Sequence, residues 1–69
     1  MKISARNVLR GKVKSVTFGM ISAEVVVELS CGDEIASVIT KRSAEELGLE
    51  VGKVVSVVIK ATNVMIAQD

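Results

Sequence analysis

Residues 21–30 read Ile-Ser-Ala-Glu-Val-Val-Val-Glu-Leu-Ser, and this stretch decides the fold class. Its odd-numbered positions are apolar from residue 23 to residue 29, whereas four of its five even-numbered positions carry serine or glutamate. Side chains alternate between the two faces of a β-strand, so this pattern is typical of a strand with one buried face. The sequence therefore predicts a β-strand over residues 21–30.

Segments on both sides extend this pattern into a meander. Residues 7–17 set Leu9, Gly11 and Val13 against a basic face, and residues 34–40 alternate in the same way. We expect Gly19 to supply a positive-φ residue in the first turn and Cys31-Gly32-Asp33 to form the second. The N-terminal half of the chain is therefore predicted to form three antiparallel strands.

A helix signal interrupts the strands after residue 40. Ser43-Ala44-Glu45-Glu46 is predicted to be a capping box, and Gly48 suits a left-handed C-terminal position. Leu47, Leu49 and Val51 are expected to plug one end of a barrel. Two further strands are predicted over 54–60 and 63–67.

This order of elements predicts an all-β, OB-like five-stranded barrel with one short helix between strands three and four. With 69 residues there is room for one small domain, predicted to span 1–69, and a core of this size is only marginally stable alone. A single cysteine and no histidine exclude an internal disulfide framework and make a zinc cluster improbable. Oligomerisation is the remaining means of support.

The last two predicted strands are apolar on both faces. Val55 and Val57 lie opposite Val54 and Val58, yet a barrel of this size has one interior. We expect a second subunit to cover the other face. The alternative is an exposed apolar edge on a monomer.

The residue inventory speaks against catalysis. Without histidine there is no imidazole base, and Cys31 has no group to activate it. The carboxylate pairs Asp33-Glu34 and Glu45-Glu46 are explained by a turn and by the helix start. The prediction is that the chain is not an enzyme. With one cysteine, no signal-peptide pattern and no long apolar run, the chain is expected to be cytoplasmic and to make no membrane contact.

Nucleic-acid binding is the alternative function that this fold class suggests. Arg10, Lys12 and Lys14 share one face of the first strand, but Phe18 is the single aromatic residue available for base stacking. The net charge of +1 gives no overall attraction to nucleic acid. We expect the basic face to be neutralised by Glu24 and Glu28 across the hairpin.

Two polar segments at strand ends indicate a different ligand. Ser4-Ala5-Arg6-Asn7 and Lys60-Ala61-Thr62-Asn63 supply hydroxyl, amide and cationic donors, and neither contains an acidic residue. Thr40, at the end of the third strand, adds a hydroxyl. Donors without acceptors favour a fully deprotonated oxyanion and disfavour monohydrogen phosphate, whose proton would find no partner.

Several of these segments together resemble one known family. The relevant stretches are Ser4-Ala5-Arg6-Asn7, the Gly19 hairpin leading into Ala23-Glu24-Val25, Ile39-Thr40 before Ser43, Glu46-Leu47-Gly48, and Lys60-Ala61. They resemble the molbindins, the small molybdate-binding Mop proteins of the TOBE family. The likeness covers essentially the whole chain.

The resemblance implies an OB-like barrel that assembles as a hexamer, a trimer of dimers, with tetrahedral oxyanions held between subunits. It implies intracellular binding of molybdate or tungstate for molybdenum storage or homeostasis, with no organic cofactor. By motif, the oxyanion-binding residues are Ser4, Arg6, Thr40, Lys60 and Ala61, the last through its backbone N–H. Arg6 either meets the anion or braces its segment through an ion pair. Ala5 and Asn7 either touch the anion or shape the segment.

Overall fold

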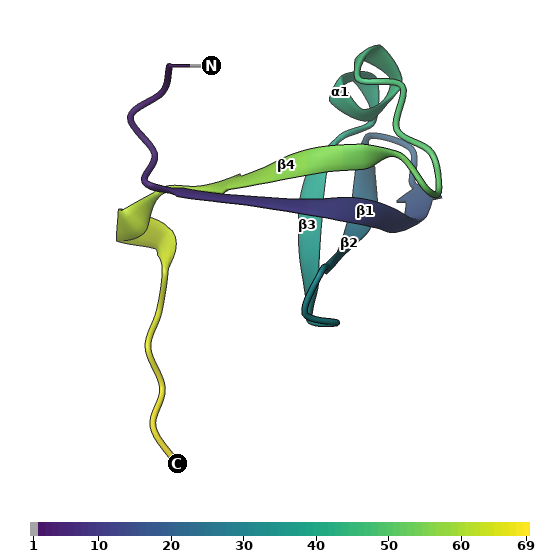
Figure 1. Cartoon of the computed structure of the whole chain (residues 1–69). Coiled ribbons are helices and arrows are strands. Elements are labelled where there is room, and N and C mark those ends of the chain that lie inside the picture. Colours follow the sequence, from purple (N-terminus) through teal and green to yellow (C-terminus); the bar gives the residue numbers. More distant parts are fainter. Residues whose placement is uncertain (1) are drawn as a thin grey trace.

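The computed structural model describes residues 2–69, which form a curled, mainly β structure with one short α-helix (Figure 1). The elements in chain order are β1 (Asn7–Phe18), β2 (Ser22–Leu29), β3 (Glu34–Thr40), α1 (Lys41–Glu46), β4 (Val54–Ile59) and the 3-10 helix η1 (Ala61–Asn63). All four strands match their predicted positions to within one residue at both ends. β2 lies within the strand predicted over residues 21–30.

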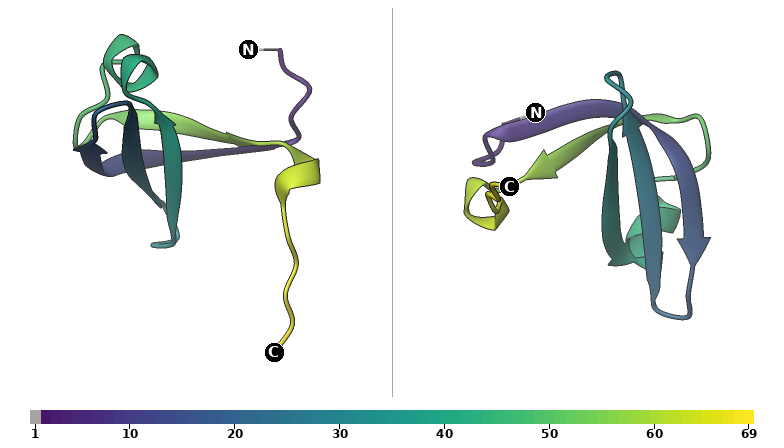
Figure 2. Two further views of the ribbon diagram at one scale, coloured as in Figure 1. Left: turned by 180° about the vertical axis from the view of Figure 1, so that it is seen from behind. Right: turned by 90° about the horizontal axis from the view of Figure 1, so that it is seen from below.

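The four strands form one antiparallel sheet in the order β3-β2-β1-β4. β1 is 12 residues long and carries a bulge between Val13 and Ser15. Its first half pairs with β4 and its second half with β2. Because a bulge bends a strand and increases its twist, the sheet curls into a half-barrel from which the β1–β4 ribbon projects (Figure 2).

The core lies on the predicted face of β2. Ala23, Val25 and Val27 are buried there together with Val13 of β1. The partly buried residues packed against this cluster are Val16, Ile39, Leu49, Val55 and Val57. Of the three residues expected to plug the barrel, only Leu49 does so, because Leu47 and Val51 are largely exposed.

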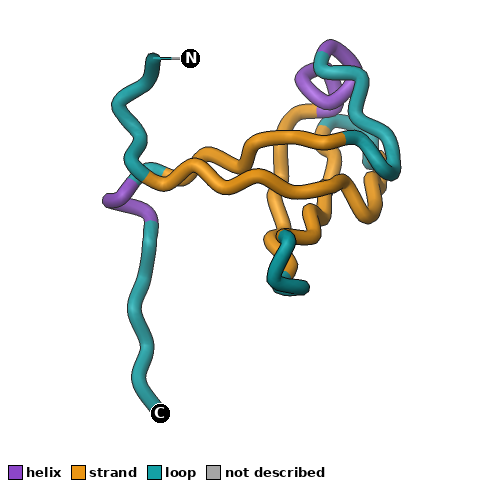
Figure 3. Tube along the Cα trace, viewed as in Figure 1, coloured by secondary structure: helices purple, strands orange, loops and turns teal. Residues whose placement is uncertain are grey.

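The prediction of a fifth strand over residues 63–67 is wrong. Residues 61–63 form η1, and residues 64–69 have no regular structure and run away from the half-barrel (Figure 3). A strand needs a neighbour for its backbone hydrogen bonds, and no strand of the described residues 2–69 pairs with the tail. The barrel is therefore an OB-like fold with four strands in place, in which β3 and β4 remain open edges.

An apolar groove lies between these two open edges. Its volume is about 410 Å³. β3 contributes Ser37 and Ile39, β4 contributes Val55 to Val58, and the loop after α1 contributes Leu47, Leu49 and Lys53. We call this cavity the open-edge groove.

The helix begins earlier than predicted. Thr40, not Ser43, is its N-cap: the Thr40 hydroxyl accepts a hydrogen bond from the Ser43 amide at 3.0 Å. Both residue types are good N-caps, and pairing of β3 through Thr40 decides between them. Glu46 accordingly pairs with Arg42 instead of closing a capping box. Gly48 does take the predicted left-handed conformation, with a φ of 62°.

The first hairpin differs from its prediction in one detail. Gly19 does not have a positive φ; the glycines that do are Gly32, Gly48 and Gly52. The turn is closed by a hydrogen bond from the Gly19 amide to the Ser22 carbonyl at 2.8 Å. A residue with an ordinary φ therefore suffices at position 19.

Gly11 is required where β1 passes from one partner strand to the other. A Cβ added at this position would lie 2.6 Å from the Glu28 carbonyl oxygen and 2.7 Å from a Val27 methyl group. We expect Gly11→Ala to lower the free energy of unfolding by about 2 kcal/mol, in the range typical of overpacking. Chemical denaturation followed by circular dichroism at fixed protein concentration measures this. The control Gly19→Ala, whose added Cβ would meet its nearest atom at 3.3 Å, is expected to lose less; equal losses would contradict the argument.

Candidate oxyanion site

The structure brings the two donor segments together. Asn7 at the start of β1 lies directly opposite Ile59 at the end of β4. Ser4-Ala5-Arg6 therefore leads into the same end of the ribbon from which Lys60 and Ala61 leave. Figure 1 shows the N-terminal segment and η1 meeting at this end, far from α1. Two donor segments more than fifty residues apart in sequence thus start from the same end of the ribbon.

The cations of this candidate site have no carboxylate partner among residues 2–69. Ser4, Arg6, Lys60 and Ala61 are exposed, while Ala5 and Asn7 are half-buried. Among residues 2–69, the ion pairs join Lys14 to Glu34 and Arg42 to Glu46. Arg6 is therefore not braced by an ion pair in the single chain, and both charges are available to an anion.

The 3-10 turn leaves two main-chain donors without a partner inside it. Its first hydrogen bond runs from the Asn63 amide to the Lys60 carbonyl at 2.9 Å. The amides of Ala61 and Thr62 precede this bond and so have no partner within the turn. The family resemblance implied the Ala61 amide as a donor. Thr62 belongs to the predicted donor segment 60–63, but its amide was not singled out.

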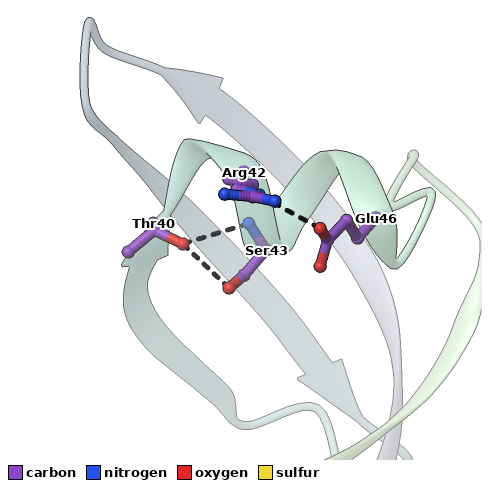
Figure 4. Close-up of polar contacts among 4 residues, drawn as sticks. All are labelled: Thr40, Arg42, Ser43 and Glu46. Carbon is purple, nitrogen blue, oxygen red and sulfur yellow. Dashed lines mark hydrogen bonds and ion pairs between the residues drawn. The ribbon is translucent and has the colours of Figure 1, made fainter.

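Thr40 is not part of this cluster. It faces Ser22 at the other end of the sheet, next to α1. Its hydroxyl accepts from the Ser43 amide and donates to the Ser43 hydroxyl at 2.8 Å (Figure 4). In one chain, therefore, Thr40 does not reach Arg6 or Lys60.

The basic face of β1 is only partly neutralised. Lys12 lies directly opposite Glu28 in the register, as predicted, but the two form no ion pair among residues 2–69. Glu24 faces Thr17 instead, Arg10 lies opposite Ser56, and Lys14, at the bulge, pairs with Glu34. The hydrogen bond to the Glu34 carboxylate, reinforced by its charge, raises the pKa of Lys14 above its usual range.

Residues 2–69 contain no cluster of three or more His, Cys, Asp or Glu side chains placed to hold a metal ion. No helix among them is long and apolar enough to cross a membrane.

Comparison with known proteins decides the family. The TOBE domain family matches residues 3–66 of the chain. The chain is also 50% identical over 66 residues to molybdenum-pterin-binding protein 3 of Clostridium pasteurianum, a match that covers 96% of this chain and 97% of the relative. This chain belongs to the Mop group of the TOBE family. The resemblance inferred from sequence is thereby confirmed.

Solved structures place this Mop chain in the same fold. A molybdate-binding protein from Sporomusa ovata superimposes with a TM-score of 0.93 at 35% identity, covering 99% of this chain and all of the other. The cytoplasmic molybdate-binding protein ModG, solved with molybdate bound, matches with a TM-score of 0.91 at 48% identity. That match covers 94% of this chain and 46% of ModG. The OB-like fold class is confirmed, and the nucleic-acid alternative is not favoured.

The names of these relatives describe binding, not catalysis. Some include a pterin, which would need stacking partners, yet Phe18 is the one aromatic residue in this Mop chain. Phe18 closes β1 at the end opposite the donor site. No organic cofactor is indicated.

Proposed function

We propose that this chain binds molybdate, or tungstate of the same charge and shape, at the donor site formed by Ser4–Asn7 and Lys60–Ala61. One observation carries the proposal: two cations without carboxylate partners, Arg6 and Lys60, lie in segments that meet at one end of the β1–β4 ribbon. The molybdate-binding relatives support the same assignment.

The chemistry of the site suits a tetrahedral dianion. Burying a charge is costly unless it is neutralised and hydrogen-bonded. Lys60 and Arg6 supply the neutralising charge, and the Ser4 hydroxyl with the Ala61 amide supplies directional donors. The small side chains of Ala5 and Ala61 let the anion approach the backbone. Neither segment contains an acidic residue that could accept a hydrogen bond from monohydrogen phosphate, which disfavours that ion.

The proposed binding unit is an oligomer. Thr40, assigned to the site by motif, lies at the other end of the sheet from Arg6 and Lys60. A second copy of the chain has to supply it. We propose the hexamer that the family resemblance implies, a trimer of dimers with anions between subunits.

The open-edge groove and the tail support a dimer in which the two copies exchange their tails. The groove is bounded by the unpaired edges of β3 and β4, where a fifth strand would close the barrel. The tail, residues 64–69, runs away from it, and Met65 and Ile66 are more than 90% exposed. A six-residue strand spans about 20 Å, comparable with the six residues of β4. We propose that the tail of a second copy occupies this groove.

The proposed cellular role follows from reversible binding of the anion without a catalysed reaction. We propose that residues 1–69 act as a single cytoplasmic Mop domain that stores or buffers molybdate, and that the chain is not an enzyme. Because the anion bridges subunits, binding is expected to stabilise the assembly by mass action.

Calorimetry with native mass spectrometry tests the proposal. Titration with molybdate and tungstate is expected to give binding heat well above that of sulfate and phosphate at the same concentration. Native spectra are expected to show a hexamer whose mass increases by bound oxyanions. Heat no greater than the sulfate control, or anions bound to isolated monomers, would overturn it.

A further inference from the structure

We propose that Asn7 is a positioning residue that fixes Lys60 and Ala61 against the N-terminal segment, and that it does not contact the anion. This inference rests on the proposed function for its consequence, but its structural part concerns the anion-free chain and is tested there separately.

The side chain of Asn7 is already engaged. Its Nδ2 atom donates a hydrogen bond to the carbonyl oxygen of Ile59 at 3.2 Å. Among residues 2–69, this is the one side-chain hydrogen bond that links the N-terminal segment to the end of β4. The Ile59 carbonyl belongs to the peptide group whose nitrogen is that of Lys60. Asn7 therefore holds the peptide plane immediately before Lys60.

Burial separates Asn7 from the ligand candidates. Asn7 is half-buried, whereas Ser4, Arg6, Lys60 and Ala61 are all exposed. The hydrogen bond to the Ile59 carbonyl places the Asn7 side chain against the end of β4.

The ribbon needs such a clamp. β1 pairs with β2 only from Gly11 onward, so residues 7–10 are paired on one side alone, with β4. Two-stranded ribbons are marginally stable and fray at their ends. Fraying here would separate Arg6 from Lys60, because these residues flank the last pair, Asn7 and Ile59. A side-chain bond across that pair opposes the separation.

Removing the clamp is expected to loosen the site before any anion is present. In Asn7→Ala, the backbone NMR order parameters of residues 60–63 are expected to fall from values typical of ordered backbone toward those of a mobile loop. The matched control is Asn63→Ala, because Asn63 is exposed in the same region and its side chain makes no hydrogen bond to residues 2–69. Unchanged order in Asn7→Ala would overturn the proposal, whether or not the chain binds molybdate.

Molybdate affinity gives the second readout. The loss of one hydrogen bond is expected to weaken molybdate binding by Asn7→Ala about fivefold. Calorimetry measures this affinity, on protein that native mass spectrometry shows to be fully assembled. A direct ligand would give the same loss, so a further variant is needed.

A cross-strand disulfide separates positioning from contact. Asn7 and Ile59 face each other in the antiparallel ladder, a placement compatible with disulfide geometry. In a Cys31→Ser background, Asn7→Cys with Ile59→Cys restores the link but not the amide. After oxidation and removal of the oxidant, molybdate affinity is expected to return to within twofold of the parent, while the reduced protein stays weak. Mass spectrometry verifies the bond. An oxidised, assembled protein that still binds weakly would show that the Asn7 amide itself meets the anion and would overturn the proposal.

Discussion

Lys60→Ala is expected to weaken molybdate binding by about a hundredfold while leaving the fold intact. A hydrogen bond to a charged group is worth about 1.5–3 kcal/mol, and the upper end of this range corresponds to roughly a hundredfold change in the dissociation constant. The Lys60 ammonium also neutralises charge, and in the single chain it has no carboxylate to lose. The fold is spared because Lys60 is exposed and follows the end of β4.

The matched control is Lys12→Ala. Lys12 is an exposed lysine on the same ribbon, opposite Glu28, and its removal changes the net charge equally. It is expected to leave the molybdate dissociation constant within twofold of the parent. Calorimetry at two salt concentrations measures both variants, since a general electrostatic effect would be screened alike in the two. Equal losses in the two variants would contradict a site centred on Lys60.

The core could be predicted from the sequence because one strand carries a clean period-two pattern. Ala23, Val25 and Val27 are buried as their alternation indicates, and β3 spans the predicted residues 34–40. The smaller errors in element boundaries arose where two neighbouring residues could play the same local role. Thr40 and Ser43 are both capping residues three positions apart, and only strand pairing distinguishes them.

The candidate site was harder to predict from local pattern. The contact between Asn7 and Ile59 depends on the β1–β4 register, which spans 52 residues of sequence, so composition identified the donor segments without placing them together. The family resemblance supplied that link. The fifth strand failed for a related reason: residues 63–67 have a strand-like apolar pattern, but the tail runs away from the open β3 and β4 edges of its own chain.

Ile66→Asp is expected to disrupt assembly and, with it, molybdate binding. If the tail of a second copy lies as a strand in the open-edge groove, alternate residues point into the apolar cavity. Val64 and Ile66 share one face, and Met65 shares the other with Ala67. Burying an unpaired carboxylate among valine and leucine side chains costs several kcal/mol. About 4 kcal/mol would raise the subunit dissociation constant roughly a thousandfold.

Met65→Asp provides the control, because it places the same charge one residue away on the opposite face. Met65 and Ile66 are almost equally exposed in the single chain, at 93% and 91%, so a free tail would tolerate both substitutions alike. A tail that lies as a strand in the groove would tolerate the substitution on its outer face and not the one on its inner face. Native mass spectrometry and sedimentation velocity across a concentration series are expected to show a smaller assembly for Ile66→Asp and the parental one for Met65→Asp. An intact Ile66→Asp oligomer would mean that the groove is filled by something other than this face of the tail.

The asymmetry between two neighbouring residues thus connects the missing fifth strand to the proposed binding site, because in the proposed assembly Thr40 of one copy completes the site of Arg6 and Lys60 of another.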